Sequence, residues 1–186
     1  MFKSYQNSFL IAMPVLNGSF FERSVIYMCQ HDENGAMGII INYKIQQNVE
    51  SLLSQLNISL PVENKMTNLY LGGPVHQEHG FILHQPTTKK WDSSIILSKD
   101  VTLTTSSDIL TAIGNSTGPK SPIIAFGYAG WSTKQLEKEI LDNDWMQIDY
   151  SADIMFNTPP QEKWDASLKS IGIQDPLQLS GFSGHA

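Results

Sequence analysis

Arg23 is the only arginine of the chain and stands directly before a run of strand-forming residues. A guanidinium can hold a carboxylate or a phosphate through two parallel hydrogen bonds, so Arg23 is a candidate clamp for an anion. The same side chain can instead form an internal salt bridge with an acidic residue of a neighbouring loop. The sequence leaves both roles open.

Histidines supply the candidate acid–base groups, because an imidazole can exchange protons near neutral pH. His31 follows a predicted strand, and His84 ends another. His84 and His185 could each line a cleft or bind backbone carbonyls. His76, His79 and His84 also raise the question of a metal site. His76 and His79 are expected in a loop without acidic partners at ligand spacing, and no metal site is predicted.

Cys29 lies two residues before His31, so both side chains can face the same side of one strand. An adjacent imidazole can stabilise a thiolate, which makes a catalytic pair conceivable. Free cysteines are among the most buried residues, however, and catalytic pairs usually form across a fold. A buried, inert thiol is the favoured interpretation.

The segment Gly127-Tyr-Ala-Gly-Trp131 is interpreted as a turn between a strand and a helix. Such a turn can offer backbone N–H groups to an anion. Neither the P-loop nor the dinucleotide-binding glycine pattern is present. The segment is therefore interpreted as a sharp turn that allows close helix–sheet packing.

Alternating and continuous apolar runs predict the elements that must position these residues. Strands are expected at residues 9–13, 24–30, 38–42, 69–71, 80–84, 94–97, 101–104, 123–128 and 145–148. Helices are expected after Asn48, after Ser106 or Ser107, over Thr133 to Asp142 and after Thr158, with Pro159 in the first helical position. Ser132 and Gln135 form a capping box, and Gly114 and Gly172 end helices.

The order of these elements and the length of the chain define the fold class. Strands dominate the first half, and strands and helices then mix without regular alternation, which favours an α+β fold with a mixed or largely antiparallel sheet. The 186 residues suit one domain over residues 1–186.

Charge and composition narrow the possible partners. The net charge is −6, and no stretch holds more than two adjacent basic residues, so nucleic-acid binding is disfavoured. No segment has the roughly 20 apolar residues that a transmembrane helix needs, so no membrane association is expected. The single cysteine excludes an intramolecular disulfide and predicts a reducing, cytoplasmic setting.

Several ordered motifs together resemble one protein family. They are Phe9-Leu-Ile-Ala-Met-Pro14, Arg23-Ser-Val25, Cys29-Gln-His31, Gly35-Ala-Met-Gly38, Gly72-Gly-Pro74, Gly80-Phe-Ile-Leu-His84, Gly127-Tyr-Ala-Gly-Trp131, Gln135-Leu-Glu137 and Gly184-His-Ala186. This set is similar to the YqgE/AlgH family of bacterial proteins and covers the chain from Phe9 to its end.

The resemblance implies a fold in which mixed, largely antiparallel β-sheet forms a pseudo-barrel with helices packed outside. It implies no agreed reaction, although some members are labelled transcriptional regulators. The chain departs from the family pattern at His79, where an arginine is frequent. It also departs at Ser132-Thr-Lys134, where a glycine-rich helix start is frequent.

These observations lead to one leading hypothesis and two alternatives. The leading hypothesis is a non-catalytic binding or regulatory protein with a surface cleft for a small anion or a protein partner, without a cofactor. Glycine bends and strand ends are expected to border that cleft. Its predicted residues are Arg23, His31, Gly72, Gly73, Pro74, His84, Tyr128 and Trp131. The alternatives are an enzyme acting on a small anionic substrate, with Arg23 as clamp and His31 or His84 as acid–base, and a DNA-binding regulator.

Overall fold

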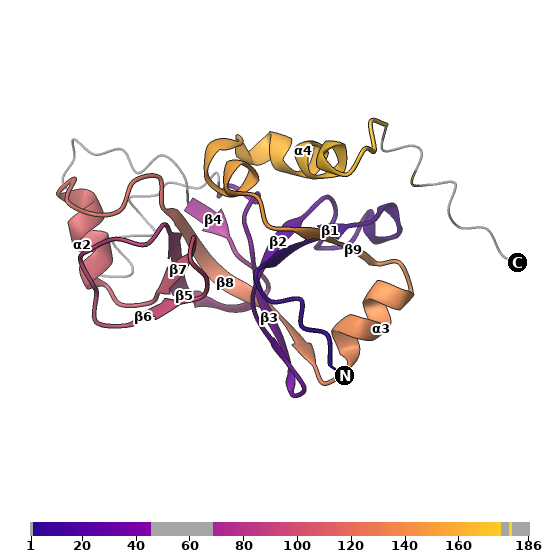
Figure 1. Cartoon of the computed structure of the whole chain (residues 1–186), viewed down its shortest axis with the longest axis horizontal. Coiled ribbons are helices and arrows are strands. Elements are labelled where there is room, and N and C mark those ends of the chain that lie inside the picture. Colours follow the sequence, from indigo (N-terminus) through magenta and orange to yellow (C-terminus); the bar gives the residue numbers. More distant parts are fainter. Residues whose placement is uncertain (1, 46–68, 176–178, 180–186) are drawn as a thin grey trace, which may run out of the picture. The chain divides into compact units, whose positions relative to one another are not determined.

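The computed structural model describes residues 2–45, 69–175 and 179, which belong to two compact units (Figure 1). Unit 1 comprises Met1–Tyr43 and Ala129–Ala186, and unit 2 comprises Lys44–Tyr128. The helix expected after Asn48 and the Gly184-His-Ala186 motif lie outside the described residues. A single domain over residues 1–186 stays a prediction.

Unit 1 contains an antiparallel sheet in the order β9-β1-β2-β3-β8. Its strands are β1 (Ser8–Ala12), β2 (Val25–Asp32), β3 (Gly35–Ile40), β9 (Trp145–Asp149) and the last residues of β8 (Ile123–Ser132). All five residues of β1 are buried, as the continuous apolar run predicts for a strand covered on both faces. Strands β2 and β3 form a hairpin in which Asp32 pairs with Gly35, so both strands extend beyond their predicted ends.

Unit 1 also contains short helical segments, which lie between its strands and after the last of them. They are η1 (Pro14–Leu16), α3 (Gln135–Leu141), a π-helical turn η2 (Asp153–Asn157), η3 (Pro160–Glu162) and α4 (Lys163–Ser170). Helix α4 packs against β1 and β2, while α3 packs against β3 and β9 (Figure 1). The core under α3 includes Leu10, Ile26, Ile40 and Leu136.

Two helix predictions for unit 1 need adjustment. The Gln135 side chain accepts a hydrogen bond from the Ser132 N–H at 2.9 Å, as a capping box requires, but the helix begins at Gln135 rather than Thr133. The helix expected after Thr158 starts as the short turn η3, with Pro160 and not Pro159 in its first position. Gly172, with a φ of 88°, follows its end as expected.

Unit 2 contains a mixed sheet in the order β6-β7-β5-β8-β4. Its strands are β4 (Leu69–Leu71), β5 (Val75–His84), β6 (Ser94–Ile96), β7 (Thr102–Thr104) and the first residues of β8. Within the described residues, β4 and β8 form the one parallel pair. Helix α2 (Asp108–Gly114) buries Ile109 and Leu110 against Ile82, Ile124 and Phe126.

The mixed, largely antiparallel α+β fold is therefore confirmed. Among the helices of the described residues, none combines the length and the apolar character needed to cross a bilayer.

The interpretation of Gly127 to Trp131 as a strand-to-helix turn is wrong. Strand β8 continues through this segment to Ser132. Tyr128 pairs with Val75 of β5, and Trp131 pairs with Ala36 of β3, so backbone hydrogen-bond partners lie alongside both parts of the segment. A loop that presents free N–H groups to an anion is not formed here.

Gly127 of β8 lies very close to the backbone of the segment that leads into β5. Its φ is 76°, and a Cβ atom placed on it would lie 2.5 Å from the carbonyl oxygen of Gly73 and 2.9 Å from that of Val75. On the opposite strand, the four residues 76–79 lie between the pairs Val75–Tyr128 and Gly80–Phe126. These four residues, here called the β5 bulge, therefore face the single residue Gly127.

We expect alanine at position 127 to destabilise the protein more than alanine at Gly18. Both glycines have a left-handed backbone, but a Cβ at Gly18 would meet nothing within 4 Å. Gly18→Ala should cost about 1 kcal/mol of unfolding free energy through its φ, and Gly127→Ala about 1–3 kcal/mol more through the clash. Urea denaturation measures both variants, and equal losses would contradict the close approach.

Candidate functional site

The predicted site residues belong to different units. Arg23, His31 and Trp131 lie in unit 1, and Gly72, Gly73, Pro74, His84 and Tyr128 lie in unit 2. Each group is described within its own unit below. A cleft shared by all eight residues stays a prediction.

Arg23 forms the internal salt bridge that the sequence allowed, yet it remains accessible. One Nη2–H donates to Asp165 Oδ1 at 3.0 Å, and 54% of the arginine side chain is exposed. The guanidinium carbon lies 4.5 Å from the centroid of the Trp164 ring, a cation–π arrangement. The Asn42 side chain donates to the Arg23 carbonyl and accepts from the Val25 N–H, which holds the left-handed backbone of Arg23.

His31 is buried and holds the N-terminal segment against β2. Its Nδ1 accepts a hydrogen bond from the Tyr5 N–H at 2.9 Å, so Nε2 carries the hydrogen and lies 3.4 Å from Glu137 Oε1. The rings of Phe2 and Tyr5 lie 4.9 and 5.1 Å from the imidazole. Ser4 donates to the His31 carbonyl. Both ring nitrogens therefore already have partners inside unit 1.

His84 is buried in unit 2 and takes part in a hydrogen-bond chain. Its Nδ1–H donates to the Gln85 carbonyl at 2.7 Å, and its Nε2 accepts from the Thr104 hydroxyl at 2.9 Å. Ser94 continues the chain at 2.8 Å from Thr104 Oγ1, and Trp91 packs edge-on against the imidazole. Burial lowers the pKa of His84 below its ordinary value. The neutral imidazole is the stable form in this core.

Trp131 is buried and anchors α3 to the sheet. Its indole N–H donates to Glu139 Oε2 at 2.7 Å, and the Trp145 N–H donates to the same oxygen at 2.8 Å. The other carboxylate oxygen accepts from Gln135. The two indole rings lie 5.9 Å apart at 82°. One carboxylate thus satisfies two indole donors that packing removes from water.

The remaining predicted residues lie around the start of β5. Gly72 donates its N–H to the Phe126 carbonyl at 2.7 Å. Gly72 and Gly73 are buried, whereas Pro74 is exposed. Tyr128 is half-buried, and its ring stacks on the His76 ring, with the centroids 6.0 Å apart.

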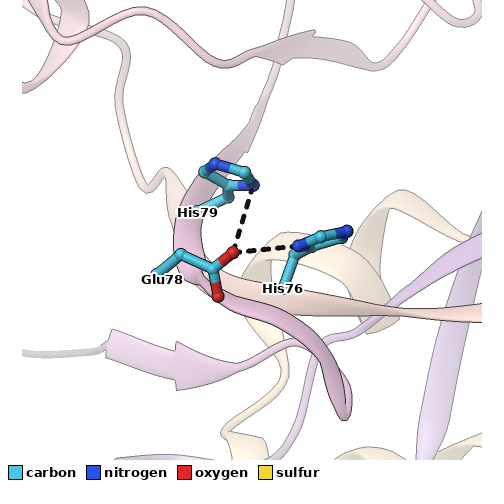
Figure 2. A group of neighbouring side chains, drawn as sticks. All are labelled: His76, Glu78 and His79. Atoms are coloured by element: carbon cyan, nitrogen blue, oxygen red, sulfur yellow. Dashed lines mark hydrogen bonds and ion pairs between the residues drawn. The ribbon is translucent and has the colours of Figure 1, made fainter.

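His76 and His79 depart from their expected setting. They lie on strand β5, not in a loop, and Glu78 of the same strand is an acidic partner, contrary to the prediction. Glu78 Oε1 lies 2.9 Å from His76 Nδ1 and 3.9 Å from His79 Nδ1 (Figure 2). The Glu78 N–H, the His76 hydrogen bond and both imidazoles lower the pKa of Glu78. The His-x-Glu-His spacing was the available sequence signal.

Cys29 and Lys163 are two further buried residues that could carry chemistry. The Cys29 Sγ–H group lies 3.7 Å from the Tyr27 carbonyl, and burial raises the pKa of its thiol. Lys163, which sequence analysis did not single out, is 2% exposed and donates to the Met155 carbonyl at the π-helical turn. Burial lowers the pKa of Lys163 to about 8. No motif or periodicity distinguished it from a surface lysine of an amphipathic helix.

Comparisons with known proteins agree with the fold and with the motif set. A model described as AlgH-like matches residues 9–175. A UPF0301 protein of Shewanella loihica is 46% identical over 185 residues, which are 98% of this chain and 99% of that protein. A UPF0301 protein of Vibrio cholerae is 43% identical over 185 residues, 97% and 98% of the two chains.

Solved structures give the same result. The solution structure of the AlgH protein from Pseudomonas aeruginosa covers 100% of both chains, with a TM-score of 0.79 and 36% identity. A crystal structure of a Corynebacterium diphtheriae protein covers 99% of this chain and 94% of its own, with a TM-score of 0.71 and 20% identity, and is similar in fold. These matches define the class, a mixed α+β protein with the AlgH architecture. The chain belongs to the AlgH-like family, also called UPF0301.

We expect His84 to make the unfolding free energy fall in mild acid. The unfolded chain takes up a proton near pH 6.5, whereas the buried imidazole takes one up only at lower pH. Stability is therefore lost as the pH falls below about 6.5 toward the folded-state pKa. Urea denaturation between pH 5 and 8 should show a smaller drop for His84→Gln than for wild type, and equal drops would contradict this.

We expect Cys29 to be unreactive in the folded protein. A buried thiol with a raised pKa forms little thiolate. Reaction with a chromogenic disulfide should be about 1,000-fold or more slower than in urea-unfolded protein, because it requires unfolding. Free glutathione serves as the control for reagent and pH. Rapid labelling of the native chain would show that the thiol is accessible.

Proposed function

We propose that this AlgH-like chain is a cytoplasmic, non-catalytic binding protein that uses Arg23 to hold an oxyanion, from a small molecule or from an acidic segment of a protein partner. The observation that carries the proposal is the exposed guanidinium, stacked on Trp164 and tied to Asp165 through a single oxygen.

The stacking prepares Arg23 for binding. A guanidinium has five N–H donors in one plane, and the Trp164 ring restricts the orientation of that plane. Trp164 is itself fixed, because its indole N–H donates to the Ala12 carbonyl at 3.0 Å. An arginine oriented in this way loses less side-chain entropy on binding than a mobile one.

Asp165 acts as an internal competitor for the same guanidinium. Its side chain is 42% exposed, so the pair is a surface salt bridge worth at most about 1 kcal/mol. An external carboxylate or phosphate can therefore replace it at small cost. The exchange would leave Arg23 on the Trp164 ring.

Catalysis is disfavoured by the state of the expected acid–base groups. His31 and His84 are buried, and both nitrogens of each ring contact groups of their own unit. The pKa of His84 is lowered, as an enzyme site can require, but burial in the core is the cause. Cys29 is buried as well.

The amino-acid composition supports a reducing compartment and a partner other than nucleic acid. A single cysteine that is buried and free suits a reducing compartment. A net charge of −6 disfavours nucleic acid. One arginine on an acidic protein suits a single oxyanion better than an extended polyanion.

We expect titration of the ¹⁵N-labelled protein with inorganic phosphate to shift the Trp164 indole signal. Arg23→Gln should abolish that shift. Asp165→Asn, which keeps the shape and removes the competitor, should strengthen binding about two- to fivefold. Lys120→Gln removes one positive charge at an exposed position, as Arg23→Gln does. It should leave binding unchanged.

A parallel titration with a hexaglutamate peptide distinguishes the source of the oxyanion. A shift with the peptide alone supports the protein partner, and a shift with phosphate alone supports a small molecule. If neither probe moves the Trp164 signal, or if the shift survives in Arg23→Gln, Arg23 is not the binding residue.

A further inference from the structure

The β5 bulge gathers three metal-ligating side chains on the surface of unit 2. His76, Glu78 and His79 are exposed, and one potential ligand atom from each lies within 4.8 Å of the other two. Figure 2 shows the Glu78 carboxylate between the two rings, with Oε1 facing Nδ1 of each. The cluster lies entirely within unit 2, and Arg23 belongs to unit 1.

The irregular backbone makes this convergence possible. In a regular strand, residues 76 and 79 would point to opposite faces. Here four residues oppose the single residue Gly127, and His76 has a left-handed φ of 49°. Non-glycine residues in that region are strained, and they are concentrated at functional sites. The bulge turns all three side chains toward one point.

The neighbours of the cluster restrict its movement. The His76 ring stacks on Tyr128, which packs edge-on against Phe81. A Cβ on Gly127 would lie 3.2 Å from the Gln77 side chain, so the bulge packs directly on β8. Restricted ligands lose less entropy when they bind an ion.

We propose that His76, Glu78 and His79 bind a divalent transition-metal ion of the Zn²⁺, Ni²⁺ and Cu²⁺ class. Two imidazoles and one carboxylate suit these ions, whereas Mg²⁺ and Ca²⁺ prefer oxygen ligands. This inference goes beyond the anion-binding role proposed for Arg23 and does not depend on it.

The distances require only small side-chain movements. Metal–ligand bonds of about 2.0–2.1 Å place tetrahedral ligands roughly 3.3 Å apart. The Glu78 oxygen lies 2.9 Å from His76 Nδ1 and 3.9 Å from His79 Nδ1, on either side of that value.

The proposed site is open. Three protein ligands leave at least one coordination position for water or for a donor of another molecule. All three side chains are exposed, so the ion should exchange readily with solution. The site is therefore suited to reversible binding and not to holding the fold together.

Calorimetric titration of the full chain with Zn²⁺ tests the site. We expect one ion per chain in wild type, and affinity weaker by about tenfold or more in His76→Gln, His79→Gln and Glu78→Gln. Glu33→Gln, which removes an exposed carboxylate outside the cluster, is the control and should bind as wild type. Unchanged affinity in the cluster variants, loss in the control, or no binding by wild type would overturn the proposal.

NMR spectra of the histidine rings can identify the nitrogen atoms that bind the ion. Long-range ¹H–¹⁵N spectra show which ring nitrogen carries the hydrogen. On adding Zn²⁺, we expect His76 and His79 to be metal-bound at Nδ1 and protonated at Nε2, with the signals of His31 and His84 unchanged. Shifts confined to other histidines would refute the assignment. Arg23→Gln should bind Zn²⁺ as wild type does. The Zn²⁺ titration therefore tests the metal site even if the anion proposal fails.

Discussion

The contact between Gly127 and the carbonyl groups of Gly73 and Val75 is the constraint on which the surface of unit 2 depends. No side chain fits at position 127, so the backbone entering β5 can approach β8 where a larger residue would keep them apart. Four residues of β5 then oppose one residue of β8. The polar bulge, the left-handed His76 and its stacking on Tyr128 all lie next to that close approach.

Much of the fold was predictable because apolar runs are local signals. Strands β1, β2, β4 and β9 and helix α2 lie close to their predicted positions, since each has a clear buried run or stripe. The first half of β5 was missed because Val75-His-Gln-Glu-His79 is polar. The glycines of β8 were interpreted as a turn. Glycine is needed at Gly127 because a neighbouring backbone lies close by, and that backbone cannot be seen in the local sequence. Register and bulges arise from partners distant in sequence.

The candidate site was less predictable for the same reason. The local sequence around a histidine at a strand end does not show whether its ring is exposed or buried. Tertiary contacts bury His31 and His84. Arg23 was recognised, but Asp165, 142 residues away, was not. Glu78 was visible in the sequence and was overlooked because a loop was expected there. Lys163 had no local signal, because the carbonyl it binds belongs to an irregular turn earlier in the chain.

The shared acceptor of Trp131 and Trp145 has a practical consequence. Because the two indoles lie 5.9 Å apart and nearly perpendicular, we expect their excited states to couple and to contribute to the circular dichroism of the protein. This contribution depends on Glu139 holding both rings, and Glu139 lies on α3. Unlabelled protein can thus report, by its own optical activity, whether α3 is seated on its sheet when ligands are added elsewhere.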